Sequence, residues 1–210
     1  MSPSRSPRSK CSSIRDSSSP AGVRIVRGAI LGWFRRAGWS IEGTRPATKK
    51  FVLMSAPHTS NWDFPVFVGV VESAGLRPRF MGKNSLFRWP MGGFMRGLGG
   101  VSVDRSASND TVQQVSALFA RHDEFALVIA PEGTRSPTTR WRTGYYRIAQ
   151  AAGVPIVCVG PDYDRRVGVF GPQIMPTGDY DADMAPAWAF FRTLKPRHPE
   201  RVMFPDGRGL

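Results

Sequence analysis

Short apolar runs alternate along this chain with longer stretches in which apolar residues recur every three or four positions. Each run is soon followed by proline or glycine, which is typical of a buried strand. Three runs have this character: residues 51–54, 125–129 and 154–159. The longer stretches are typical of helices, and they cover residues 60–73, 106–122, 141–152 and a final segment around 188–194. Strands alternating with helices predict an α/β fold in a single domain, with a mixed, mostly parallel sheet flanked by helices.

The two ends of the chain lack this pattern. Residues 1–20 are mostly Ser, Pro, Arg and Lys, a composition that buries too little apolar surface to order itself, so we expect a disordered basic tail. A Ser- and Arg-rich, acid-poor start is also typical of an organelle transit peptide, and both interpretations stay open. Residues 196–210 show no periodicity and are expected to fray. One folded domain is therefore expected over residues 41–195.

Residues 21–40 predict an amphipathic helix. On a helical wheel its apolar side chains lie within about 100° of arc, with the arginines outside. This apolar stripe contains Val23, Val26, Ile30, Trp33 and Phe34. Such a helix either lies in a membrane interface or packs on its own domain with a solvated basic face. Spanning a bilayer requires about 20 apolar residues, so we expect no transmembrane helix here.

Positive charge is concentrated near the start of the chain. The net charge is +13, and the first fifty residues hold eleven Lys or Arg against Asp16 and Glu42. This asymmetry favours an N-terminal segment that faces an anionic surface. A non-catalytic basic module that binds membranes or nucleic acid is the alternative class. The chain has only two cysteines, Cys11 and Cys158, and three widely separated histidines, so we expect neither a disulfide framework nor a metal site.

A first polar cluster follows the run 51–54 and reads Pro57-His58-Thr59-Ser60-Asn61-Trp62-Asp63. A histidine at the mouth of a strand, five residues before an aspartate, can act as a general base whose tautomer the carboxylate holds. Within one helix, five residues would turn the two side chains about 140° apart. We therefore expect His58 before a helix whose first turn contains Asp63, with Ser60 as N-cap. The same residues would equally form a capping box without any chemistry.

A second polar cluster follows the run 125–129 and reads Ala130-Pro131-Glu132-Gly133-Thr134-Arg135-Ser136. Together the two clusters resemble the glycerolipid acyltransferase family, whose lysophosphatidic acid acyltransferases carry a His-x4-Asp motif and a later Pro-Glu-Gly-Thr-Arg motif. The resemblance covers about residues 50–180. It includes a glycine-rich block from Lys83 to Arg105 that is similar to the family's second motif block.

The resemblance implies acyl transfer to an alcohol. In that reaction His58 takes the proton of the acceptor hydroxyl, while Asp63 bonds the other ring nitrogen and stabilises the imidazolium that forms. A covalent acyl-enzyme is not expected, because the Gly-x-Ser-x-Gly elbow of serine hydrolases does not occur in the sequence.

The resemblance also implies a phosphate-binding group around the second cluster. Arg135 would supply a bidentate fork, with unblocked N–H groups beside it. Glu132 would orient Arg135 or accept a hydrogen bond from a glycerol hydroxyl. The candidate substrate-binding residues are Glu132, Gly133, Thr134 and Arg135, with Lys83 and Arg105 in second rank.

The implied donor is an acyl-CoA or acyl carrier protein thioester, with no cofactor, and the implied acceptor is 1-acyl-glycerol-3-phosphate in phospholipid biosynthesis. The protein would act peripherally at the cytoplasmic face of a membrane, which residues 21–40 contact, and would not bind nucleic acid. Two departures concern the acceptor: Pro57 stands where the family often has Asn, and Ala130 where it often has Phe. Another lysolipid or a phosphate-free acceptor is therefore the alternative substrate.

Overall fold

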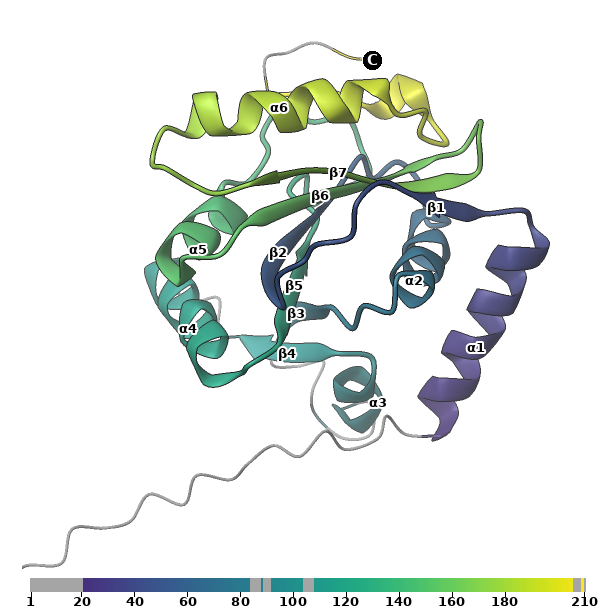
Figure 1. Ribbon diagram of the computed structural model, residues 1–210, viewed down its shortest axis with the longest axis horizontal. Helices are drawn as coiled ribbons and strands as arrows, with labels where there is room; N and C mark the ends of the chain where they lie inside the picture. Colours follow the sequence, from purple (N-terminus) through teal and green to yellow (C-terminus); the bar gives the residue numbers. More distant parts are fainter. Residues whose placement is uncertain (1–20, 84–87, 89–91, 104–107, 206–208, 210) are drawn as a thin grey trace, which may run out of the picture.

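A central sheet organises the computed structural model, which describes residues 21–83, 88, 92–103, 108–205 and 209 (Figure 1). Within these residues seven strands form one sheet in the order β1-β7-β6-β2-β5-β3-β4. The strands are β1 (Ser40–Glu42), β2 (Lys50–Ser55), β3 (Arg79–Lys83), β4 (Gly100–Val103), β5 (Phe125–Ile129), β6 (Ile156–Asp162) and β7 (Val167–Ile174). Only β6 and β7 pair antiparallel, and the other pairs are parallel. The predicted mixed, mostly parallel sheet is confirmed.

Helices cover both faces of this sheet. Those described are α1 (Ala21–Arg36), α2 (Asp63–Ser73), α3 (Gly92–Gly97), α4 (Ser108–Arg121), α5 (Gly144–Ala152) and α6 (Tyr180–Thr193). Side chains of β2 alternate between the two faces, as the pleat of a strand requires. Phe51 and Leu53 pack in a core with α1 and α2, whereas Val52 and Met54 pack in a second core with α4, α5 and α6. Burial on both faces explains why this strand is a continuous apolar run.

Several elements differ from the sequence-based prediction. Helix α2 begins at Asp63 instead of near residue 60, α5 begins at Gly144 instead of 141, and β6 extends to Asp162. No helix or strand was predicted within the glycine-rich block from Lys83 to Arg105, but it contains α3 and β4. Both elements are short and rich in glycine, so neither has a period that the sequence alone reveals.

The segment after α6 is packed against the domain up to residue 205, although the sequence predicts that it frays. Val202 and Phe204 are buried, and residues Pro199–Arg201 form a short 3-10 helix. The indole N–H of Trp141 donates to the carbonyl oxygen of Met203 at 2.9 Å. No apolar period is visible in these residues, because two or three apolar side chains are enough to anchor so short a segment.

Helix α1 lies against α2 at one side of the sheet. Phe34 is buried against Gly69, where a Cβ atom would come within 2.2 Å of the phenyl ring. Arg27 pairs with Glu72 at 3.5 Å. The predicted stripe is thus divided, since Val23 and Phe34 are buried while the side chains of Val26 and Trp33 stay partly exposed.

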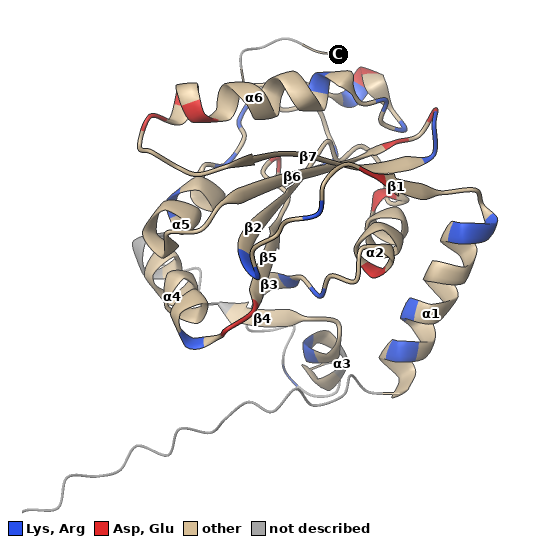
Figure 2. Cartoon of the chain, in the orientation of Figure 1, with Lys and Arg blue, Asp and Glu red and all other residues tan. Residues whose placement is uncertain are grey.

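The outer part of α1 is basic and carries no acidic residue (Figure 2). Arg27 is an exception to the expected basic outer face, because it bonds to Glu72 and to the carbonyl oxygen of Leu98 at 3.0 Å. Among the helices that the structure describes, none is both long enough and apolar enough to cross a bilayer.

Candidate active site

His58 and Glu132 enter the site from two neighbouring strands. Strands β2 and β5 are parallel and pair in register, with Met54 opposite Ile129. The chain therefore leaves both strands at the same edge of the sheet, which is where α/β folds commonly place their sites. The expectation that His58 and Glu132 are neighbours in space agrees with this arrangement.

The carboxylate of Glu132 faces His58 at two points. Its Oε1 accepts a hydrogen bond from the backbone N–H of His58 at 2.9 Å, and its Oε2 lies 3.7 Å from Nδ1 of the imidazole. Both side chains are largely shielded, with 22% of His58 and 8% of Glu132 exposed. Glu132 was expected to orient Arg135 or to accept a hydrogen bond from a glycerol hydroxyl, whereas in the structure its carboxylate contacts His58.

The pKa of His58 lies above its ordinary value. Burial has the largest single effect and lowers this pKa, but the adjacent carboxylate of Glu132 and the charge of Asp63 together raise it by more. The positive charge of Arg135 acts in the opposite direction. Because Nδ1 is buried beside a carboxylate, Nε2 is the nitrogen available to a substrate.

Asp63 does not hydrogen-bond to His58, which corrects the predicted pairing. Its Oδ2 accepts from the backbone N–H groups of Thr59 and Ser60 at 2.7 and 2.8 Å. Its Oδ1 accepts from the hydroxyl of Tyr163 at 2.7 Å. Asp63 is 3% exposed, so its charge is buried and satisfied by these three donors, and it shapes the loop that carries His58.

The predicted capping arrangement is only half present. The N-cap of α2 is Trp62 and has no side-chain cap hydrogen bond. Ser60 lies two residues earlier, where its Oγ accepts from the backbone N–H of Trp62 at 3.2 Å. The carboxylate of Asp63 reaches back to Ser60, as the acidic member of a capping box does.

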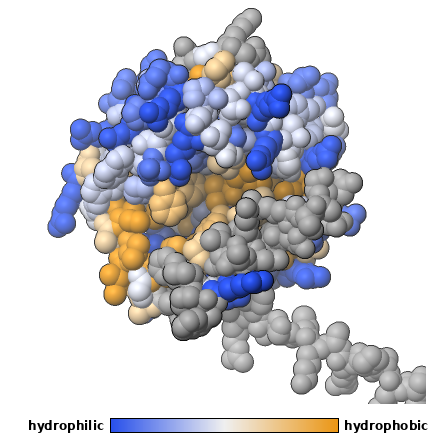
Figure 3. Space-filling model, turned by 180° about the vertical axis from the view of Figure 1, so that it is seen from behind, coloured by the Kyte–Doolittle hydropathy of each residue, from blue (hydrophilic) through white to orange (hydrophobic). Residues whose placement is uncertain are grey.

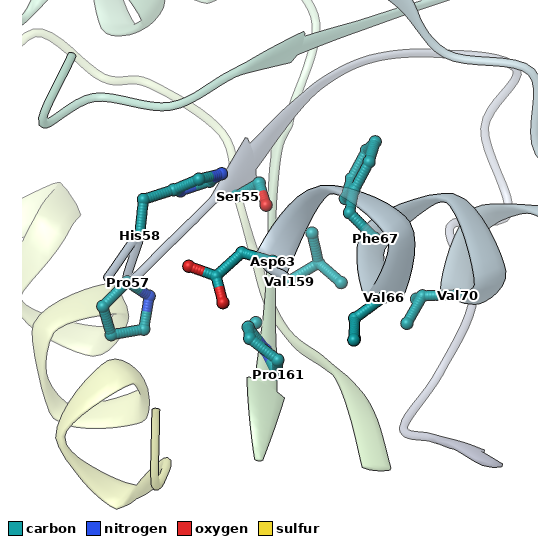
Figure 4. A pocket seen from close by; sticks show the side chains of 10 residues that line it. Ser55, Pro57, His58, Asp63, Val66, Phe67, Val70, Val159 and Pro161 are labelled. Atoms are coloured by element: carbon teal, nitrogen blue, oxygen red, sulfur yellow. The ribbon is translucent and has the colours of Figure 1, made fainter. Parts of the chain in front are cut away.

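The imidazole of His58 and the carboxylate of Asp63 point in different directions (Figure 4). Beside them is a small cavity of about 10 Å³, lined by Ser55, Pro57, Val159 and Pro161 among others. This volume corresponds to about one water-sized sphere. Asp63 therefore acts on His58 through its charge and through the loop.

A much larger cavity of about 720 Å³ opens beside His58. Its wall is mostly apolar and aromatic and includes Phe64, Phe67, Phe80, Met81, Ile129, Ala130, Tyr145 and Ile148. Two cations, Arg135 and Arg142, also line it. An apolar cavity with one titratable group and two guanidinium groups is suited to an amphiphilic, anionic ligand.

The turn after β5 positions these cations. Gly133 has a φ of 64°, in the left-handed region that glycine adopts most readily. A Cβ atom there would come within 3.2 Å of Nε of Arg142, so the glycine leaves room for that side chain. Thr134 is exposed, and its hydroxyl accepts from the backbone N–H of Ser136 at 3.1 Å.

Lys83 and Arg105, the second-rank candidates for phosphate binding, have side chains outside what the structure describes. Lys83 is the last residue of β3, and its side chain lies outside what the structure describes. Arg105 lies outside the described residues altogether. Arg142, which was not among the predicted site residues, takes a place in the cavity wall instead.

Sequence reasoning also missed the residues that hold the His58 loop. The hydroxyl oxygen of Thr59 accepts from the backbone N–H of His198 at 3.2 Å, and the carbonyl oxygen of Thr59 accepts from Arg201 at 3.3 Å. Tyr163, 100 residues from Asp63, completes the set. No local pattern marks these residues, because each contact joins distant parts of the chain.

Cys158 takes no part in this site. It is fully buried in β6, and burial raises the pKa of its thiol to about 12. A thiol so protonated is a poor nucleophile. Among the described residues, no three His, Cys, Asp or Glu side chains gather closely enough to hold a metal ion.

Comparisons with known proteins point to one family. The family model described as Acyltransferase matches residues 39–161, more than half of the chain. The fold is similar to that of the 1-acyl-sn-glycerophosphate (LPA) acyltransferase PlsC from Thermotoga maritima, with a TM-score of 0.55 over 81% of this chain and 79% of that chain. The two sequences are 19% identical, so this likeness concerns the fold. None of the curated proteins matches the chain.

Proposed function

Because the chain belongs to the acyltransferase family, we propose that it moves a fatty acyl group from an acyl thioester to the free hydroxyl of 1-acyl-glycerol-3-phosphate. The donor is acyl-CoA or acyl carrier protein, and no cofactor takes part. The observation that carries this proposal is the position of His58, which lies beside Glu132 at the wall of the large apolar cavity.

In the proposed reaction, neutral His58 accepts the proton of the acceptor hydroxyl at Nε2. The hydroxyl oxygen attacks the thioester carbonyl carbon, so that the C–O ester bond forms and the C–S bond breaks. The imidazolium returns its proton to the departing thiolate, and a free thiol and an ester are released. The carboxylate of Glu132 stabilises the positive charge that the ring carries between these two steps.

The cavity wall provides for both parts of the acceptor. Its aromatic and aliphatic side chains suit an acyl chain, and the guanidinium groups of Arg135 and Arg142 suit a phosphate. Gly133 and Thr134 belong to the same turn and offer backbone N–H groups. The large cavity is thus proposed to hold the acceptor with its hydroxyl near His58.

A phosphate-free or different lysolipid acceptor is the second candidate. It is favoured by Ala130, which lines the cavity where the family often has Phe and so leaves more space. Transfer from one labelled thioester to a panel of acceptors with and without a phosphate distinguishes the two candidates. Formation of product only from phosphate-free acceptors would reject the phosphate-bearing substrate.

The reaction itself is tested by mass analysis of products from purified protein, labelled acyl-CoA and lysophosphatidic acid. His58→Ala is expected to lower transfer by about 10²–10⁴-fold, the usual contribution of a general base. His122→Gln is the matched control, because His122 lies at the end of α4 and stacks on Phe125, away from the cavity. Undiminished transfer by His58→Ala would reject the mechanism.

A further inference from the structure

A third cavity lies next to Trp62 and Tyr163, apart from the large cavity beside His58. Its volume is about 270 Å³. Four aromatic side chains and two guanidinium groups line it: Trp33, Trp39, Trp62, Tyr163, Arg166 and Arg197. We call these six residues the aromatic-arginine pocket. These residues come from α1 and the segment after it, the start of α2, the β6–β7 turn and the segment after α6. The proposed reaction uses none of them, so the pocket is available for another role.

The two arginines of this pocket lack acidic partners. Within the part of the chain that the structure describes, neither Arg166 nor Arg197 forms an ion pair with a carboxylate. Their neighbour Arg165 shows the contrast, since it pairs with Glu42 at 2.8 Å and with Asp162 at 3.1 Å. Two uncompensated positive charges in one cavity attract an anion and repel a cationic ligand.

Arg166 lines the pocket and has an unfavourable backbone conformation. Its φ is 53°, and among the described residues it is the one non-glycine residue with a positive φ. Such a conformation is disfavoured for any L-residue that carries a Cβ atom. The guanidinium of Arg166 donates to the carbonyl oxygen of Ala37 at 2.9 Å, which ties the β6–β7 turn to the end of α1. Strain of this kind is often found at binding sites.

Two of the four aromatic side chains, Trp33 and Trp62, are solvent-exposed. Trp33 and Trp62 have ring centroids 5.6 Å apart, and they are 36% and 48% exposed. The guanidinium of Arg197 lies 5.5 Å from the ring centroid of Trp62 and 6.0 Å from that of Tyr163. Indoles next to arginines are typical of a membrane interface, where the rings lie at headgroup level and the cations meet phosphates.

Exposed aliphatic and aromatic side chains lie on α1, which contains Trp33, and on α2, which follows Trp62. Ile25 is 71% exposed and Val26 41% exposed on α1, and Phe64 is 55% exposed at the start of α2. Hydrophobic residues gather in a band across the face opposite to that of Figure 1, and the band extends to the side on which α1 lies (Figure 3). A soluble nucleotide would need the cations and rings but not these exposed apolar groups, whereas a lipid surface uses all three.

We infer that the aromatic-arginine pocket binds the phosphate headgroup of an anionic bilayer phospholipid. Arg166 and Arg197 contact the phosphate, and Trp33 and Trp62 lie at the level of the headgroups. Ile25 and Val26 reach the acyl boundary beside them. The bound lipid is a structural anchor and not a substrate, because His58 lines a different cavity.

This inference deepens the proposed function, on which it rests for its consequence. Trp62 lines the aromatic-arginine pocket, and Phe64, two residues later, lines the large cavity beside His58. A lipid bound at Trp62 therefore brings that cavity up to the bilayer, from which a lysolipid acceptor can enter. Tyr163 lines the pocket and donates to Asp63, the carboxylate that shapes the His58 loop.

The test is binding of the full-length protein to phosphatidylcholine vesicles that contain a minority of phosphatidylglycerol, measured by co-sedimentation. The double variant Arg166→Gln/Arg197→Gln is expected to bind about tenfold more weakly or worse, because two charge-assisted contacts are lost. The matched control is Arg121→Gln/Arg147→Gln, which removes the same charge from exposed positions on α4 and α5. Its vesicle binding is expected to change less than about twofold.

Three outcomes would overturn the inference. The first is equal losses in both double variants, which would reveal general electrostatic attraction. The second is wild-type binding by Arg166→Gln/Arg197→Gln at an unchanged thermal midpoint. In the third, coenzyme A quenches the tryptophan fluorescence of the wild type but not that of Arg166→Gln/Arg197→Gln, while this variant still binds vesicles normally. That result would assign the pocket to a nucleotide. Failure of the proposed reaction is seen separately, because His58→Ala should lose transfer while its vesicle binding stays unchanged.

Discussion

Glu132 contacts His58 both at its backbone N–H, at 2.9 Å, and beside Nδ1 of its ring, at 3.7 Å. The candidate general base and its nearest carboxylate thus come from two motifs 74 positions apart. The aspartate five residues after the histidine lies further from the ring and is engaged by three other donors. The acid that most directly affects the base is therefore Glu132.

Removing the charge of Glu132 should shift the pH dependence of transfer. A general base works in its neutral form, so activity should rise with pH through the raised pKa of His58. In Glu132→Gln the carboxylate no longer raises this pKa, so the rising limb of the pH–rate profile should move to lower pH. NMR titration of the His58 ring should show the same direction. Glu124→Gln, an exposed carboxylate paired with Lys49, is the control. An unshifted profile in Glu132→Gln would contradict the role given to this carboxylate.

Asp63→Asn should reduce stability as well as transfer. The buried carboxylate accepts three hydrogen bonds, and an amide can satisfy these donors only in part, so we expect a loss of about 1–3 kcal/mol in the free energy of unfolding. Tyr163→Phe removes one of these bonds and should cost about 1 kcal/mol. Urea unfolding of both variants provides the measurement. If Asp63→Asn lost transfer with no change in stability, Asp63 would act on the ring directly.

Thr59→Val should loosen the loop that carries His58. Valine keeps the shape of the buried side chain but leaves the backbone N–H of His198 without its acceptor, for a cost of about 1 kcal/mol. We expect faster amide hydrogen exchange in residues 57–63 and a lower kcat. Thr193→Val serves as the control, because its hydroxyl bonds within α6 at an exposed position. Equal exchange in the two variants would show that the contact does not order the loop.

Phe204→Ala should destabilise the domain by about 3–5 kcal/mol, as truncation of a fully buried aromatic side chain usually does. Phe204 is 0% exposed and packs on Trp141, with ring centroids 5.6 Å apart. Met175→Ala, at a position 55% exposed, should change the free energy of unfolding by less than about 0.5 kcal/mol. Similar thermal midpoints for the two variants would mean that the segment after α6 contributes nothing to the core.

Ala130→Phe should narrow the large cavity and change the length of acyl chain that it prefers. The added ring would occupy space beside His58, so transfer involving the longest acyl chains should fall by about tenfold, while shorter chains are less affected. Competition between acyl chains of different length in one assay measures this change. The control is Ala151→Phe, at an exposed position of α5. An unaltered chain-length profile in Ala130→Phe would mean that the acyl chain does not occupy this part of the cavity.

The sequence predicts the strand ends of this site better than the contacts between its side chains. Apolar runs located β2 and β5, and the polar clusters after them located His58 and Glu132, because strand periodicity and proline are local signals. The pairing of Asp63 with His58 was wrong, since Tyr163 and two backbone N–H groups engage that carboxylate. Tyr163 lies 100 residues away and only tertiary packing brings it near.

The sequence also does not predict which arginines form ion pairs in the fold. Arg27 has the sequence pattern of a solvated helix face, but in the fold it pairs with Glu72. Arg166 and Arg197 have no distinguishing pattern at all, and they share a cavity because the β6–β7 turn and the segment after α6 meet beside α1. Charge patterning along a helix cannot report which cations a distant carboxylate will neutralise.

The contact between Thr59 and His198 spans 139 positions of the chain. Proteins are synthesised from the N-terminus, so the segment with the candidate base leaves the ribosome long before its binding partner has been made. Strands β5 and β6, which flank β2 in the sheet, are also made later than β2, so the loop that carries His58 is secured only once most of the chain is present. The loop that carries the candidate base is thereby fixed late, when nearly all of the domain has been translated.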